Sequence, residues 1–185
     1  MRLFIASGFP PPFLERVNEV RAFAMERLGS AVKWVEPENL HLTYAFLGDW
    51  PQDRVPAAGK CVEAAAGLVK KPEVSLGGLG AFPSLERPRV LWLGLNEREP
   101  GALDALARKL YRSLAAAGFI LEHKFSAHIT LGRVKALLPR PALEEIRQKA
   151  AAAEAGCRLS SVELMASSLS ASGPVYRTLV SRDLL

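Results

Sequence analysis

Cysteine is scarce in this sequence, which holds only two in 185 residues. Cys61 and Cys157 lie far apart, and neither belongs to a Cys-x-x-Cys pair. This spacing argues against a disulfide scaffold and against a structural zinc site. We therefore expect two buried free thiols.

Long apolar runs are missing as well. No run approaches the roughly 20 residues that a membrane-spanning helix needs. The short apolar stretch at the N-terminus meets Pro10, Pro11 and Pro12 too early for a secretory signal. We expect no membrane association and a cytoplasmic location.

The sequence also lacks the common glycine-rich phosphate loops. It has no P-loop, and no Gly-x-Gly-x-x-Gly follows an apolar run of strand type. Gly77, Gly78 and Gly80 open no helical pattern and predict a kinked strand instead. The net charge of +5 comes without a dense run of Lys or Arg. Such an excess is compatible with a polyanionic partner, but a compositional bias toward Arg explains it equally well.

Hydrophobic periodicity predicts a mixture of helices and strands. Helices are expected over about 13–28, 53–69, 103–114 and 141–150. Strands are expected over 2–9, 32–35, 40–47, 74–82, 90–95, 119–121 and 124–131, with two more between 158 and 182 around a turn at 172–174. Because strict βαβ alternation is absent, the predicted class is α+β. Each half carries a helix, a strand and a His-x-Thr strand, so we expect residues 1–185 to form one domain of two pseudo-symmetric lobes around a cleft.

Two rare residue types form a repeated motif. The chain has three histidines and three threonines, and two of the histidines have a threonine two positions later: His41 with Thr43, and His128 with Thr130. Chance would give two such pairs on the order of once in a thousand sequences of this composition. The third histidine, His123, has no such partner and is expected at the surface or at a strand end.

The residues around each motif alternate in polarity. Leu42, Tyr44 and Phe46 alternate with the first motif, and Ile129 and Leu131 with the second. Side chains two apart on a strand share a face. We therefore expect the apolar residues to pack inward and the His and Thr of each motif to share the other face.

Two imidazoles and two hydroxyls at one spot suit phosphodiester hydrolysis without a metal. One histidine can take a proton from water while the other gives one to the leaving oxygen. Threonine hydroxyls can donate hydrogen bonds to phosphate oxygens as charge builds. A metal site is less favoured, since no Asp, Glu or Cys stands at ligand spacing from either motif. A non-catalytic module that binds nucleotides or RNA ends is the main alternative.

The segments MRLFIA, ENLHLTYAFLG, RPRVLWLGL, KFSAHITLGR and GPVY resemble the LigT-type 2H phosphoesterases, known as RNA 2′,3′-cyclic phosphodiesterases or 2′-5′ RNA ligases. The resemblance implies a bilobal α+β fold that acts without a cofactor on RNA termini or cyclic nucleotides. We expect the protein to be a monomer. It implies that His41 and His128 are catalytic, and that Thr43, Thr130 and Arg133 bind the phosphate. It favours His128 as base and His41 as acid, although the reverse stays open, and it favours a 2′-phosphate product.

Some positions depart from the family pattern or raise a question of geometry. Tyr44 and Ala45 replace the more usual Leu and a basic residue, and Ala127 replaces Pro. Arg133 has the parity of Ile129 and would face the core, unless the strand bulges at Gly132. The aromatic residues nearest the motifs in sequence are expected in the core more than against a base: Phe9, Trp34, Tyr44 and Phe125.

Overall fold

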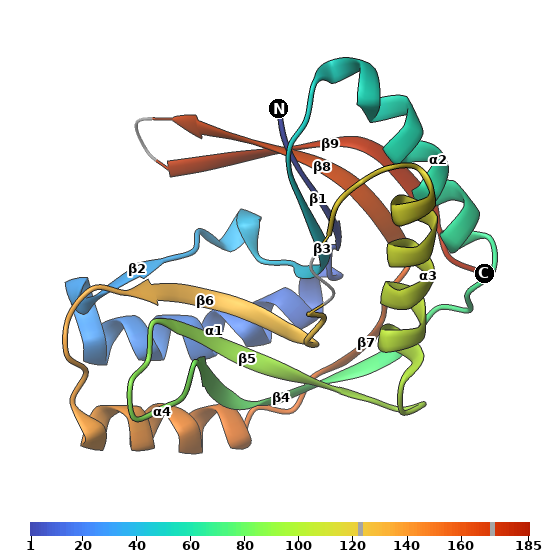
Figure 1. The fold of residues 1–185 in the computed structure, drawn as a ribbon. Coiled ribbons are helices and arrows are strands. Elements are labelled where there is room, and N and C mark those ends of the chain that lie inside the picture. Colours follow the sequence, from blue (N-terminus) through green and yellow to red (C-terminus); the bar gives the residue numbers. More distant parts are fainter. Residues whose placement is uncertain (122–123, 171–172) are drawn as a thin grey trace.

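The computed structural model describes residues 1–121, 124–170 and 173–185, and within these it is an α+β fold built on one large sheet (Figure 1). The strands are β1 (Arg2–Ser7), β2 (Val32–Trp34), β3 (Leu42–Asp49), β4 (Glu73–Phe82), β5 (Val90–Glu97), β6 (His128–Val134), β7 (Gly156–Arg158), β8 (Ser161–Ser170) and β9 (Gly173–Asp183). The helices are α1 (Pro11–Leu28), α2 (Val55–Ala66), α3 (Ala102–Ala116) and α4 (Arg140–Ala151), with short 3₁₀ segments η1 (Gly29–Ala31), η2 (Pro37–Asn39) and η3 (Gln52–Arg54).

The sheet is antiparallel, and the two strands that carry the motifs lie at the centre of its strand order. The order is β7-β4-β5-β6-β3-β1-β8-β9, and β2 pairs with β6 beside β3. The two strands that carry the His-x-Thr motifs, β3 and β6, are therefore central neighbours. Next to them lie β1, which pairs with β3, and β5, which pairs with β6. β1 lies at the start of the first half of the chain, and β5 lies at the start of the second.

The helices pack against the sheet in two pairs. Figure 1 shows α1 and α4 against the half that holds β4 to β6, and α2 and α3 against the half that holds β1, β3, β8 and β9. The predicted helical periodicity is confirmed in α1, whose Phe13, Val17 and Val20 are buried. Its end is set by Gly29, which adopts a φ of 50° that favours glycine.

Some predicted boundaries are wrong. Residues 119–121 form no strand, because Phe119 packs instead on Trp50 as part of a connection, with ring centroids 4.7 Å apart. The strand expected from Lys124 begins only at His128, and β7 was not predicted. His123 and residue 172 of the predicted turn lie outside the described residues.

The cysteines differ in their burial. Cys61 is buried, as predicted, whereas Cys157 on the edge strand β7 is only partly buried. Both are free thiols. Desolvation raises the pKa of Cys157 to about 11, so this thiol is protonated at neutral pH and a poor nucleophile.

Among the described residues, none of the helices is both long and apolar enough to cross a membrane.

Candidate active site

The two motif strands meet at the centre of the sheet, where Leu42 of β3 pairs with Ile129 of β6. Both side chains are fully buried on the side of the helices. The histidine and threonine that flank each of them therefore lie on the opposite face, here called the motif face. The antiparallel register places each histidine across from the threonine of the other motif. The motif face thus gathers His41, Thr43, His128 and Thr130.

Both histidine rings are held in the same way. The Nδ1–H of His41 donates to the carbonyl oxygen of Asn39 at 2.6 Å, and the Nδ1–H of His128 donates to that of Ser126 at 2.8 Å. Each bond reaches back two residues and fixes the tautomer, leaving Nε2 as the nitrogen available for proton transfer. The sequence gives little indication of these two hydrogen bonds, because a backbone carbonyl acceptor requires no particular side chain.

Burial sets the acid–base behaviour of the pair. Desolvation is the main cause that lowers the pKa of both histidines below the ordinary value of 6.5, and the backbone hydrogen bonds oppose it. The charge of His128 lowers the pKa of His41 further, which shows that the two rings interact electrostatically. One protonated ring thus disfavours protonation of the other, as acid and base roles require.

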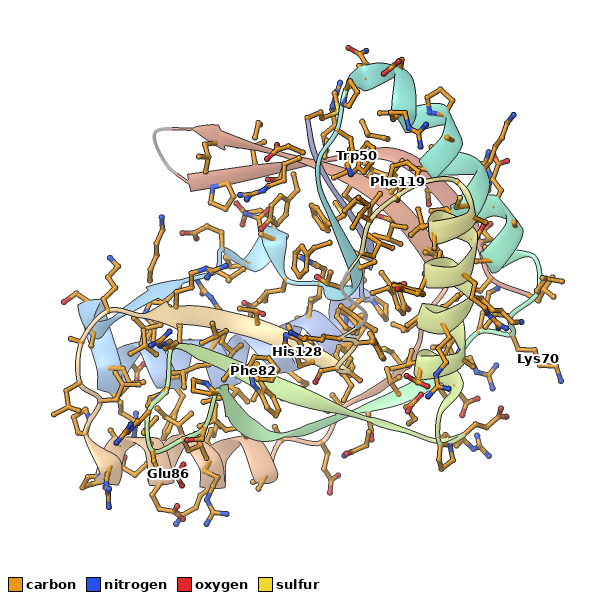
Figure 2. All side chains as sticks on the ribbon, in the orientation of Figure 1. Trp50, Lys70, Phe82, Glu86, Phe119 and His128 are labelled. Carbon is orange, nitrogen blue, oxygen red and sulfur yellow. The ribbon has the colours of Figure 1, made fainter. Side chains whose placement is uncertain are left out.

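An aromatic pair packs on each histidine. Phe4 and Tyr176 stand by His41 with ring centroids at 5.2 Å and 5.4 Å. Phe82 and Trp92 stand by His128 at 5.0 Å and 5.9 Å. Figure 2 shows Phe82 beside His128. Sequence reasoning missed all four aromatic residues, because strands remote in the chain bring them to the motifs.

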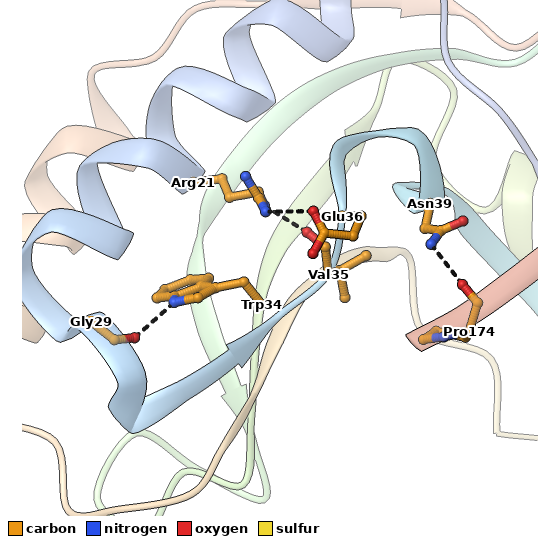
Figure 3. A network of polar contacts seen from close by, with 7 residues as sticks. All are labelled: Arg21, Gly29, Trp34, Val35, Glu36, Asn39 and Pro174. Carbon is orange, nitrogen blue, oxygen red and sulfur yellow. Dashed lines mark hydrogen bonds and ion pairs between the residues drawn. The ribbon is translucent and has the colours of Figure 1, made fainter. Parts of the chain in front are cut away.

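Asn39 joins the first motif to the far end of the sheet. Its side-chain amide donates to the carbonyl oxygen of Pro174 at 3.1 Å (Figure 3), while its own carbonyl holds His41. Pro174 is the second residue of β9 and lies two residues before Tyr176, which contacts the His41 ring. One residue thus ties β9 to the position of His41, and sequence analysis did not identify it.

A bulge in β3 corrects the predicted alternation. Ile5 pairs with Ala45 and Ala6 with Thr43, so Tyr44 is an extra residue on this strand. Tyr44 stays in the core, but the bulge shifts the alternation by one residue. Phe46, two positions later, is therefore 73% exposed. Its ring lies on the motif face, 6.3 Å from that of Phe4. The prediction that Phe46 packs inward is therefore wrong.

A second bulge decides the direction of Arg133. Leu91 pairs with Gly132 and Trp92 with Thr130, so Leu131 is the extra residue. Gly132 then turns to the core and Arg133 to the motif face, where it is exposed. The condition under which Arg133 could reach the motifs is thus met. The positions of all the predicted site residues, His41, Thr43, His128, Thr130 and Arg133, are on this one face.

The aromatic residues that are nearest to the motifs in sequence behave as predicted. Phe9 and Tyr44 are buried in the core, and Trp34 and Phe125 pack against it while partly buried. Tyr44 is held by a hydrogen bond between its hydroxyl and that of Ser7 at 3.0 Å. In the part of the chain that the structure describes, no group of three or more His, Cys, Asp or Glu side chains could hold a metal ion.

Comparison with known proteins identifies the family to which this chain belongs. The family model described as LigT like phosphoesterase matches the chain in two stretches, residues 8–92 and 93–176. The chain belongs to the LigT-like phosphoesterase family. Each stretch contains one His-x-Thr motif, so the predicted family resemblance is confirmed.

Relatives of this LigT-like chain match over nearly its whole length. An Archaeoglobus fulgidus protein named RNA 2′,3′-cyclic phosphodiesterase is 35% identical over 181 residues, which cover 97% of this chain and 98% of that one. An Aeropyrum pernix protein of the same name is 36% identical over 82% of this chain and 85% of its own.

Solved LigT-like structures share the fold. Protein TT0787 of Thermus thermophilus superposes with a TM-score of 0.78 at 28% identity and covers 100% of this chain and 98% of its own. Escherichia coli LigT complexed with 3′-AMP superposes with a TM-score of 0.66 at 28% identity, over 99% of this chain and 96% of its own. The predicted α+β class is confirmed.

Proposed function

We propose that this LigT-like phosphoesterase opens 2′,3′-cyclic phosphates at RNA ends or on nucleotides and leaves a 2′-phosphate. The observation that carries the proposal is the convergence of two His-x-Thr motifs on one face, with both Nε2 atoms free for proton transfer. The names of the relatives and the 3′-AMP bound to E. coli LigT support the same substrate class. We place the activity in a cytoplasmic monomer.

The proposed reaction is an in-line displacement at phosphorus. His128 takes a proton from water, whose oxygen forms the new bond to phosphorus. The bond from phosphorus to O3′ breaks, and His41 gives its proton to O3′. The products are a free 3′-hydroxyl and a 2′-phosphate. If a 5′-hydroxyl of RNA takes the place of water, its oxygen forms the new bond to phosphorus, the bond to O3′ breaks as before, and the product is a 2′-5′ linkage. Cleavage of that linkage to a cyclic phosphate is the reverse of this ligation.

The other groups of the motif face bind the phosphate. Thr43 and Thr130 donate hydrogen bonds to its non-bridging oxygens, where negative charge builds in the transition state. Among described residues neither threonine hydroxyl has a hydrogen-bond partner, so both are free to do this. Arg133 contributes a planar charged donor set suited to phosphate. The exposed Phe46 gives a nearby ring on which a nucleobase can stack.

Incubation with a nucleoside 2′,3′-cyclic phosphate in EDTA, followed by product analysis, tests the proposal. We expect turnover in the chelator and a 2′-monophosphate. A 3′-monophosphate would mean that O2′ rather than O3′ lies beside the acid, and the acid and base assignments would then lose their support. Binding without turnover would favour a non-catalytic module, and turnover that EDTA abolishes would favour a metal-dependent hydrolase.

A further inference from the structure

The motif face carries a basic pair beyond the two motifs. Lys33 of β2 stands directly opposite Arg133 of β6 in an antiparallel pairing. Side chains of directly opposite residues project from the same face, with Cβ atoms about 4.5–5.5 Å apart. Lys33 and Arg133 therefore project together.

Their shared face is the motif face. On the other side of β6, Arg133 pairs with Val90, and Thr130 pairs with Trp92. Val90 and Trp92 are two apart on β5 and so share a face, and the Trp92 ring contacts His128.

The neighbours of Lys33 in β2 point the other way. Val32 is buried, and the indole N–H of Trp34 donates to the carbonyl oxygen of Gly29 at the end of α1, 3.0 Å away (Figure 3). Lys33 is exposed between them. The strand is thus anchored by its alternate residues, and it presents Lys33 beside Arg133 on the face of the active site.

The charges of this pair are not neutralised by the protein. Neither Lys33 nor Arg133 has a carboxylate within 4.0 Å among the described residues. The nearby Glu36 is turned toward Arg21 on the helix side, 3.8 Å away (Figure 3). Like charges directly opposite each other in a sheet are destabilising. An anion bound between them would offset this cost.

The bulge in β6 adds an independent observation. A Cβ at Gly132 would lie 2.5 Å from Cγ1 of Val32 and 2.8 Å from the carbonyl oxygen of Lys33. Only glycine fits there, and that bulge is what turns Arg133 toward Lys33. Arg133 is also close enough to Tyr176 to influence it electrostatically. Burial raises the pKa of Tyr176, and the positive charge of Arg133 opposes this increase. The pair therefore borders the space in front of the motifs.

We propose that Lys33 forms, next to Arg133, a second phosphate subsite that binds the phosphodiester on the 5′ side of the terminal nucleotide. This inference rests on the proposed function, in which Arg133 holds the cyclic phosphate. It assigns the enzyme to RNA ends rather than to free cyclic mononucleotides, since a nucleoside cyclic phosphate has no 5′ phosphodiester for Lys33 to bind.

Three substrates and three variants test the subsite. The substrates are a nucleoside 2′,3′-cyclic phosphate, its 5′-phosphorylated form, and a dinucleotide ending in the cyclic phosphate. The variants are Lys33→Ala, Lys33→Arg and Lys60→Ala, the last removing an equal charge from an exposed position on α2. Melting temperatures verify that all three are folded.

We expect Lys33→Ala to raise KM for the dinucleotide about tenfold, as for one lost charge-assisted phosphate contact near water. The nucleoside substrate should be unaffected, and the 5′-phosphorylated form should respond like the dinucleotide. The dependence of log KM on log salt for the dinucleotide should flatten by about 0.7, the value for one phosphate contact on a single strand. Lys33→Arg should keep the wild-type KM, and Lys60→Ala should change nothing.

An equal loss on the nucleoside and the dinucleotide, or no loss on either, would overturn the subsite. If the wild-type protein hydrolyses none of the three substrates, the proposed function fails. Binding of a dinucleotide with a terminal 2′-phosphate, compared with that of a nucleoside 2′-phosphate, then decides the subsite alone. Tighter binding of the dinucleotide that depends on Lys33 supports it, and equal binding rejects it.

Discussion

The two histidines show how the backbone can orient a side chain for chemistry. Each ring is oriented by a backbone carbonyl two positions earlier, and each is flanked by aromatic rings. Removing the ring therefore takes away the proton-transfer group but leaves the buried partner residues Leu42 and Ile129 in place. Function and stability are separable at these positions.

We expect His41→Ala and His128→Ala each to lower kcat by the roughly 10²–10⁴-fold typical of a lost acid or base. Both variants should stay folded, because the histidines lie on the motif face. Steady-state kinetics and thermal melting check this together. A loss of melting temperature that matches the loss of activity would show that the histidines are structural.

The pH dependence follows from the lowered pKa of both rings. The reaction needs one neutral and one protonated histidine, a state that is most populated between the two pKa values. Since burial holds both pKa values below 6.5, kcat/KM should peak below pH 6.5 and fall about tenfold per pH unit above it. The bound anion favours the protonated form, so the alkaline limb of kcat should lie at higher pH than that of kcat/KM. A kcat/KM that rises through pH 8 would contradict a two-histidine mechanism.

At the scale of elements, the bulges decide which residues reach the motif face. The β6 bulge depends on Gly132, since a Cβ there would meet both Val32 and the backbone of Lys33. Gly132→Ala should destabilise the fold by about 1–3 kcal/mol, as overpacking does, and it should raise KM by displacing Arg133. Gly78→Ala on β4 is the matched control, because its Cβ would meet nothing within 4 Å. Denaturant unfolding and kinetics of both variants give the comparison, and equal stability of the two would refute the role of Gly132.

The same bulges mark what the sequence could predict. Rare residues in a repeated spacing were enough to predict the motifs, since both strands keep their alternation from His to Thr. Alternation failed beyond the threonines, at Phe46 and Gly132, because an extra residue depends on the register of the partner strand. Ala45 stands where the family more usually has a basic residue, and in the structure it packs against the core.

Contacts between remote segments could not be predicted from spacing. Phe4 and Tyr176 reach His41 from strands at opposite ends of the chain. The short apolar run at Phe119 looks like a strand, but it packs as a connection beside Trp50 and beneath the guanidinium of Arg54, 4.9 Å from its ring. Short runs of this kind do not distinguish a strand from a buried loop.

At the scale of the molecule, we propose that the two halves are related by a pseudo-twofold axis between β3 and β6. The strand order supports this, since β1 and β5, then β8 and β4, follow at matching positions on each side. The two bulges support it too: Ala6 pairs with Thr43 and Trp92 with Thr130, and one extra residue follows the threonine on each motif strand. The two stretches that match the family model meet between residues 92 and 93, so they divide the chain into two halves with one motif each.

The halves are interlocked, however, rather than separate. The first half of the chain supplies β4, which pairs with β5 and β7, and the second half supplies β8, which pairs with β1. The helices are shared as well, because α1 packs with α4 and α2 with α3. Each half of the chain therefore completes the sheet of the other.

This interlocking predicts how the chain behaves when it is cut in the loop after β4. With a break after the exposed Glu86 (labelled in Figure 2), residues 1–86 keep only the β1–β3 pairing, and residues 87–185 keep only β5–β6 and β8–β9. We expect neither fragment to fold alone, since each leaves the apolar faces of its helices and strands in water. Mixed in equal amounts, they should recover near-ultraviolet circular dichroism and cyclic-nucleotide hydrolysis, with the intact chain refolded in parallel as control. A cooperative unfolding transition of either fragment by itself would show that the lobes are independent folding units.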